Sequence, residues 1–217
     1  MRTLALEFSS ARRTVAAGDA QGSCVRPLEQ GGTPGGAFEV IAAVLREAGL
    51  EREQIECLAV GLGPGSYNGI RSAIATAQGW ELAGGTRLRG VSSADCLVWE
   101  AQTAGLLGRV NVVIDAQRSE FYLGRYDVHA GNFVRREPLR LATLEEVRAL
   151  AESGEILVGS DVNKWIPTAR QLFPSANALI SLADRCSDFT PGEKLEPVYL
   201  REANFVKAPA PRPLPAL

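Results

Sequence analysis

Apolar and polar residues follow two different rhythms in the first fifty residues. Residues 3–29 contain three short apolar stretches separated by small polar residues, a pattern typical of antiparallel strands joined by turns. Over residues 37–48 the apolar positions recur at helical spacing until Gly49, and Thr33 with Pro34 forms a typical helix start. The chain is therefore predicted to open with a β-meander that leads into a helix.

A similar order of elements follows in the rest of the chain. The pattern next predicts a buried strand at 55–61, a helix at 67–83, a strand at 88–92 and a helix at 94–106. The second half predicts strands at 110–115, 121–125 and 132–141, a helix at 143–152, a strand at 156–160 and a helix at 164–172. The order strand, strand, strand, helix, strand, helix thus occurs twice.

The repeated order predicts an α/β fold of two duplicated lobes with mixed sheets flanked by helices. The first strand of each half ends in an acid, Glu7 and Asp115, as in actin-like and sugar-kinase folds with ribonuclease-H-like lobes. Chance is the alternative, because many strands end in an acid. We expect a first lobe at 1–106, a second, reduced lobe at 107–203 and a disordered proline-rich tail at 204–217.

Composition narrows the function. The formal charge of −2 and the pI near 5.6 give no broad basic surface, so any contact with RNA is expected to depend on a partner. The four cysteines are far apart and His129 is the single histidine, which predicts free thiols, no metal site and no cofactor. The first residues hold too short an apolar run for a signal peptide or a membrane span, so we expect a cytoplasmic protein.

The stretch GLGPGSYNGIR, residues 61–71, resembles a phosphate loop without matching either common type. It lacks the lysine of a Walker loop, and its glycine spacing differs from that of a Rossmann loop. Free N–H groups of Gly63, Gly65 and Ser66, with Arg71, would still suit an anion or a nucleotide. The alternative is a sharp strand-to-helix turn that Ser66 caps.

Catalytic patterns are weak. No glycine stands where a nucleophile elbow around Ser66 requires it, and His129 lies in an expected turn. Glu7 and Asp115 would form a facing pair of cleft acids if the duplication holds, and such acids bind Mg²⁺ or act as bases in actin-like enzymes. Glu7, however, is followed by FSS rather than by a glycine-bearing hairpin.

The first two helices carry a stronger signal. The helix at 37–48 has a wider apolar surface than one sheet contact requires, and the helix at 67–83 is rich in alanine and glycine. Small residues let another helix approach closely, which predicts association with a second chain. Burial of both faces within the same domain is the alternative.

Four motifs resemble the TsaB (YeaZ) family of tRNA threonylcarbamoyladenosine synthesis. They are GLGPGSYNGIRSAIATAQGWEL, VSSADCL, VVIDAQRSEFYLGRYD and LEPVYLRE, and they occur in the family's order up to about Arg201. This chain departs from the family at three positions. Glu7 stands where the family usually has Asp, Asn68 where Thr is usual, and Gln117 where Arg is common. The first departure further weakens a nucleotide role for the first lobe.

The resemblance implies an actin-like fold without catalytic equipment. Family members bind and stabilise TsaD, the paralogous metal-bearing subunit that transfers threonylcarbamoyl to the adenosine beside the anticodon, with TsaE as ATPase partner and tRNA contacted through the complex. Alone, they pair with a second copy. TsaD carries a metal-binding histidine pair on its first helix, and this chain has none there. Carried over, the partner interface comprises Phe38, Ile41, Leu45, Ile70, Ala73, Ile74 and Ala77.

Two functions are therefore weighed from the sequence. The first is a non-catalytic scaffold and activator subunit for TsaD. The alternative is an autonomous actin-like ATP-dependent phosphotransferase or hydrolase that uses Glu7 and Asp115.

Overall fold

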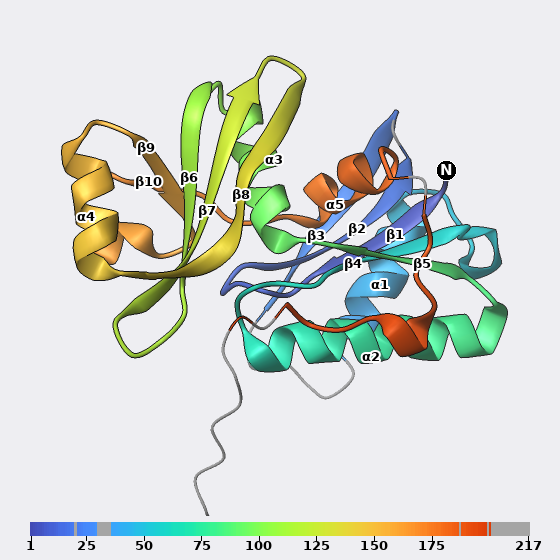
Figure 1. Cartoon of the computed structure of the whole chain (residues 1–217). Helices are drawn as coiled ribbons and strands as arrows, with labels where there is room; N and C mark the ends of the chain where they lie inside the picture. Colours follow the sequence, from blue (N-terminus) through green and yellow to red (C-terminus); the bar gives the residue numbers. More distant parts are fainter. Residues whose placement is uncertain (20, 30–35, 187, 199, 201–217) are drawn as a thin grey trace, which may run out of the picture.

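Two five-stranded mixed sheets form the framework of the chain (Figure 1). The structure is a computed structural model that describes residues 1–200 except 20, 30–35, 187 and 199. The first sheet has the order β3-β2-β1-β4-β5 and comprises β1 (Thr3–Glu7), β2 (Arg13–Asp19), β3 (Gly22–Leu28), β4 (Cys57–Gly61) and β5 (Arg87–Val91). The second has the order β10-β9-β6-β7-β8 and comprises β6 (Gly108–Asp115), β7 (Glu120–His129), β8 (Asn132–Thr143), β9 (Ile156–Gly159) and β10 (Arg170–Gln171).

The two sheets share one connectivity. In each, the first three strands form an antiparallel meander, and the fourth and fifth strands extend the sheet in parallel from the first strand. This repeated order confirms the predicted duplication and the actin-like α/β fold. Each meander begins with a strand that ends in an acid, Glu7 or Asp115, as expected.

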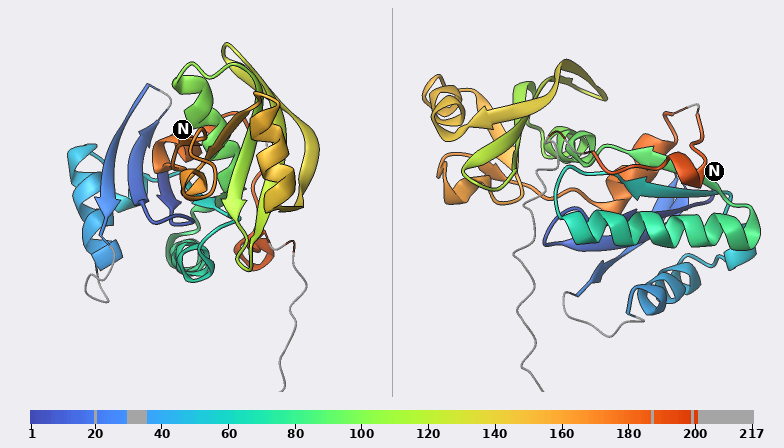
Figure 2. Two further views of the ribbon diagram at one scale, coloured as in Figure 1. Left: turned by 90° about the vertical axis from the view of Figure 1, so that its left-hand side faces the viewer. Right: turned by 60° about the horizontal axis from the view of Figure 1, so that its bottom comes forward.

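Helices cover both faces of the first sheet. The structure contains α1 (Gly36–Glu47), α2 (Tyr67–Gly84), α3 (Ser93–Thr103), α4 (Leu144–Glu152), α5 (Ala176–Ala183) and the short 3-10 turns η1 (Arg52–Gln54), η2 (Val162–Lys164) and η3 (Gly192–Lys194). Helices α1 and α2 lie side by side on one face, and α5 lies on the other (Figure 2). We call this sheet with α1, α2 and α5 the first lobe.

Two helices cross between the halves of the sequence. Helix α3, which precedes β6, packs through Leu97 and Val98 on the second sheet, whereas α5 packs through Leu179 on the first. The second sheet with α3 and α4 is called the second lobe below. The predicted boundary at residue 106 stays a prediction, and the packing crosses it in both directions.

The helix predicted at 164–172 is wrong. This segment forms η2 and the short β10, because Pro167 lacks a backbone donor and restricts the residue before it. The helix that the sequence pattern missed is α5, which begins at the capping residue Ser175 directly after Pro174. The predicted helix start at Thr33 and Pro34, and the tail at 204–217, lie outside the described residues.

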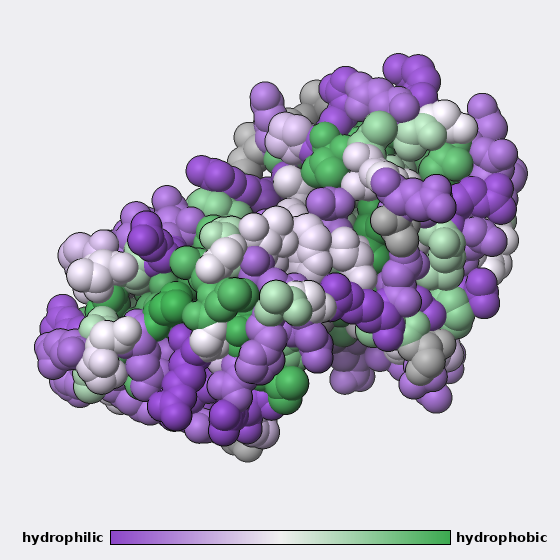
Figure 3. All heavy atoms as spheres, turned by 90° about the horizontal axis from the view of Figure 1, so that it is seen from above, coloured by the Kyte–Doolittle hydropathy of each residue, from purple (hydrophilic) through white to green (hydrophobic). Residues whose placement is uncertain are grey.

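No described helix combines the length and the apolar character that a membrane crossing needs. On the face seen from above Figure 1, apolar residues form patches that hydrophilic residues interrupt (Figure 3).

Candidate partner groove and the loop before it

An apolar groove lies between α1 and α2 on the outer surface of the first lobe. It encloses a cavity of about 440 Å³. Its lining comes from Phe38, Ile41, Ala42 and Leu45 of α1, Ala75, Thr76, Gly79 and Trp80 of α2, and Arg52 of η1. Phe38 is 59% exposed, although it is large and apolar, so the groove presents surface that the described residues leave uncovered.

The residues predicted for a partner interface divide into two groups. The first group lies on α1 and lines the groove: Phe38 is exposed there, whereas Ile41 and Leu45 are buried. The remaining four predicted residues, all on α2, are buried against the chain's own sheet: Ile70, Ala73, Ile74 and Ala77. A charge at Ala73 or Ala77 would therefore test folding rather than an interface.

Helix α2 has small residues on two sides. Ala73 and Ala77 face the sheet, whereas Ala75 and Gly79 are exposed and line the groove. The sequence pattern did not separate these sides, because alanine and glycine give little contrast in hydrophobic periodicity. The spacing of four residues between Ala75 and Gly79 is the signal that identifies the outer side.

An aromatic residue and a cation line the groove side by side. The guanidinium of Arg52 lies over the Trp80 ring, 4.7 Å from its centroid, which is the geometry of a cation–π contact. Beyond this pair, an adjoining hollow is lined partly by charged residues, among them Glu53, Glu56 and Arg87. The surface thus changes from apolar to charged at Trp80.

The loop between β4 and α2 is packed against the turn that follows β1. The backbone N–H of Ser66 donates to the Ser9 carbonyl oxygen at 2.7 Å, and the Ser66 hydroxyl caps α2 by accepting from the Gly69 N–H. A Cβ at Gly65 would overlap the backbone of Ser9, and one at Gly69 would overlap that of Phe8. The glycines therefore allow close packing, which favours the turn interpretation of the loop.

Three of the four residues predicted to contact an anion have hydrogen-bond partners within the chain. The Gly63 N–H donates to the hydroxyl of Ser93 at 3.1 Å, and Arg71 donates to the Tyr67 hydroxyl at 3.0 Å. Ser66 is engaged as described, and Gly65 packs on Ser9. Anion or nucleotide contact at Gly63, Gly65, Ser66 and Arg71 stays a prediction.

Glu7 lies beneath this loop rather than at an open surface. It is fully buried, and its carboxylate accepts hydrogen bonds from the Ser9 N–H at 2.8 Å and from the Ser93 hydroxyl at 2.9 Å. Burial raises its pKa, and the Ser9 and Ser93 hydrogen bonds oppose that rise. A carboxylate with both oxygens bound inside the protein is poorly placed to hold Mg²⁺ or to act on a substrate.

Asp115 is in a different setting. It is partly exposed, and its carboxylate accepts from the Gln117 N–H at 2.7 Å, which stabilises the turn into β7. Residues 117–119 of that turn all have φ near +60°. Glu7 and Asp115 thus have separate hydrogen-bond partners. Among the residues that the structure describes, no three His, Cys, Asp or Glu side chains form a potential metal site.

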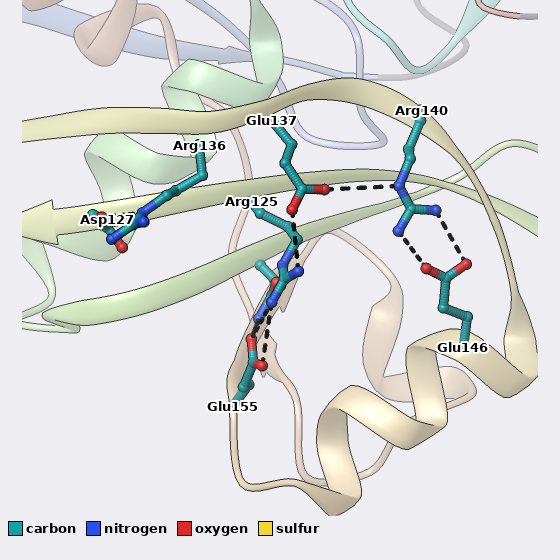
Figure 4. A network of polar contacts seen from close by, with 8 residues as sticks. Arg125, Asp127, Arg136, Glu137, Arg140, Glu146 and Glu155 are labelled. Carbon is teal, nitrogen blue, oxygen red and sulfur yellow. Dashed lines mark hydrogen bonds and ion pairs between the residues drawn. The ribbon is translucent and has the colours of Figure 1, made fainter.

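A polar network occupies part of the second sheet (Figure 4). Arg125 forms ion pairs with Glu137 at 3.2 Å and with Glu155 at 3.4 Å, and the buried Asn111 donates to Glu155 at 2.9 Å. These residues line a small hollow together with Arg109 and the ion pair of Arg136 with Asp127. Sequence patterns did not indicate this network, because it depends on the register that places Arg125 of β7 between Asn111 of β6 and Glu137 of β8.

Comparisons with known proteins point to one family and to the two-lobed fold described above. The model of the family TsaD, tRNA N6-adenosine threonylcarbamoyltransferase, matches residues 37–155, more than half of the chain. The tRNA threonylcarbamoyladenosine biosynthesis protein TsaB of Escherichia coli is 29% identical over 75% of this chain and 78% of its own length. The solved structure of YeaZ from Pseudomonas aeruginosa superimposes with a TM-score of 0.77 at 25% identity, covering 91% of this chain and 99% of that one.

The chain belongs to the TsaB/YeaZ family. A second Pseudomonas aeruginosa structure, described as an uncharacterized protein with similarity to peptidase YeaZ, gives a TM-score of 0.79 at 25% identity over 92% of this chain and 99% of that chain. The family assignment that the four sequence motifs suggested is thus confirmed. The last of these motifs, LEPVYLRE, lies partly outside the described residues, since 199, 201 and 202 are not among them.

Proposed function

We propose that this TsaB/YeaZ family chain is a non-catalytic scaffold and activator subunit that binds and stabilises the TsaD transferase through the groove between α1 and α2. The family implicates the chain in tRNA threonylcarbamoyladenosine biosynthesis. In the proposed complex, TsaD transfers the threonylcarbamoyl group to the adenosine beside the anticodon. TsaE acts as the ATPase partner, tRNA is contacted through the complex, and the chain pairs with a second copy when alone.

The observation that carries the proposal is the groove, which the part of the chain that the structure describes leaves uncovered. Apolar side chains on both helices, with Phe38 more than half exposed, form a continuous surface that an apolar partner would remove from water. The exposed small residues Ala75 and Gly79 would let a partner helix approach α2 closely. The TsaD family model matches the part of the chain that begins with α1, which supports a paralogous partner.

The burial of Glu7 weighs against the alternative, an autonomous ATP-dependent phosphotransferase or hydrolase. Such an enzyme needs a carboxylate that reaches the metal or the nucleophile, and both oxygens of Glu7 are bound by the chain itself. A calorimetric titration with Mg-ATP tests this alternative. Tight binding with turnover that is lost in Glu7→Ala would overturn the scaffold proposal.

Co-purification with TsaD of the same organism tests the proposal directly. Ala75→Glu places a charge in the groove at an exposed position, so we expect loss of the complex while the chain remains folded. Ala149→Glu is the matched control, because Ala149 is also exposed on a helix but lies on α4 in the second lobe. No association with TsaD, or equal association of both variants, would contradict the proposed groove function.

A further inference from the structure

Ser93, the first residue of α3, is bound to two segments of the first lobe at once. Its N–H donates to the Gly63 carbonyl oxygen at 2.9 Å, and its hydroxyl accepts from the Gly63 N–H at 3.1 Å. The same hydroxyl donates to Glu7 at 2.9 Å. Ser93 and Glu7 are both fully buried, so water does not readily replace these bonds when one is lost.

One side of α3 belongs to the core of the second lobe, while Cys96 packs with α5 in the first. Leu97, Val98 and Ala101 are fully buried and pack in one cluster with Val110 and Val112 of β6. Figure 1 shows α3 between the two sheets. A shift of the second sheet would therefore move α3, and Ser93 would transmit that movement to the loop at Gly63.

The loop is in turn interlocked with α2. A Cβ at Gly63 would overlap the side chain of Ile70, which lies in the first turn of α2. Glu7 reaches the same helix by a second route, because its other oxygen accepts from the Ser9 N–H and the Ser9 carbonyl accepts from Ser66, the N-cap of α2. One buried carboxylate thus joins the start of α3 to the start of α2.

The geometry points to Ser93 as a positioning residue that couples the second lobe to α2, and thereby to the groove, through Glu7 and Gly63. The inference depends on the proposed function only for what occupies the groove. The coupling itself is a property of the free chain, so it is measurable without a partner.

Hydrogen exchange of the free chain provides the test, read at the amides of Ser66 and Ile70, which Ser93 does not contact. In Ser93→Ala, we expect these amides to exchange at least about tenfold faster, because loss of a buried hydrogen bond to a carboxylate lowers the cost of local opening. Ser92→Ala is the matched control, since the buried Ser92 hydroxyl has no hydrogen-bond partner among the described residues. If Ser93→Ala does not fold, Glu7→Gln weakens the same bond at nearly constant size, and we expect the same direction.

A second perturbation tests the coupling itself. Val112→Ala loosens the packing under α3 in the second lobe, and we expect faster exchange at Ile70 in the otherwise unchanged chain. In the Ser93→Ala chain the same substitution is expected to have a smaller effect, because both side-chain hydrogen bonds of residue 93 are gone and only its backbone bond to Gly63 remains. Equal exchange in Ser93→Ala and Ser92→Ala, or an equal Val112→Ala effect in both chains, would overturn the inference.

Binding of TsaD separates this inference from the proposed function. If the unchanged chain does not bind TsaD but the exchange results hold, the proposed function is wrong and the coupling stands. If TsaD binds and the two serine variants exchange alike, the coupling is wrong and the proposed function stands.

Discussion

The carboxylate of Glu7 fills the space above the α-carbon of Gly61, so that any Cβ at residue 61 would overlap it. Gly61 is the last residue of β4, and both residues are buried. Glutamate at position 7 and glycine at position 61 therefore depend on each other.

Gly61→Ala is expected to destabilise the fold by about 1–3 kcal/mol, because the added methyl group displaces the Glu7 carboxylate from its hydrogen bonds. Shortening the acid with Glu7→Asp should restore part of this loss, since the carboxylate then withdraws toward β1. Urea unfolding of the two single variants and the double variant measures the coupling. Strictly additive losses would show that Glu7 does not limit the space at residue 61.

The two glycines of α2 that the structure places in opposite environments give a second prediction. Gly79 has open space around it, so Gly79→Ala should stabilise the helix by about 0.5–1 kcal/mol. Gly69→Ala should destabilise the chain, because its Cβ would overlap the Phe8 carbonyl. Thermal unfolding of the two variants tests this, with a higher Tm expected for Gly79→Ala and a lower Tm for Gly69→Ala than for the unchanged chain.

Gly79 also lines the groove, which separates stability from binding. If a partner helix approaches α2 at Gly79, the more stable Gly79→Ala chain should bind TsaD more weakly. Unchanged or tighter binding would place the contact elsewhere on the groove.

The two lobes were predictable because their meanders depend on local alternation and turns. The patterns gave β1 to β3 and the strand-to-helix step at 55–83 close to their observed limits. They could not give the crossing of α3 and α5, because that packing depends on contacts far apart in the sequence. They also could not show that Glu7 is buried, since the glycine loop that covers it folds back from β4.

The environment of Glu7 predicts a pH dependence. Burial raises its pKa above the ordinary value of 4.5, so the folded chain retains this proton to higher pH than the unfolded chain. The stability contributed by the protonated group is fully present below the unfolded pKa and is lost as pH rises through the folded pKa. As pH rises, the free energy of unfolding of the unchanged chain should fall relative to that of Glu7→Gln. The total fall is roughly 1.4 kcal/mol for each unit by which the folded pKa exceeds the unfolded pKa.

Urea unfolding of both chains between about pH 4 and pH 8 checks this sign. The free energy of unfolding of the unchanged chain minus that of Glu7→Gln should fall with rising pH and then level off. A difference that increases with pH would mean that the hydrogen bonds from Ser9 and Ser93 outweigh burial and lower the pKa instead.

The network around Arg125 gives the last prediction (Figure 4). Arg125→Met removes the ion pairs to Glu137 and Glu155 while it keeps an aliphatic stem of similar length. Glu155, whose side chain is only 19% exposed, would then retain the Asn111 hydrogen bond without a cation. Because a mostly buried carboxylate without its cation is costly, we expect the free energy of unfolding to fall by about 1–2 kcal/mol, as measured by urea unfolding.

Lys164→Met is the control for this network. Lys164 pairs with Asp161 at 2.8 Å, but its side chain is 64% exposed, and exposed pairs contribute little. We expect a change within about 0.5 kcal/mol there, and partial rescue of Arg125→Met by Glu155→Gln, which removes the uncompensated charge. If Lys164→Met and Arg125→Met lower the free energy of unfolding equally, and Glu155→Gln does not rescue Arg125→Met, then solvent screens the network as fully as it screens a surface ion pair.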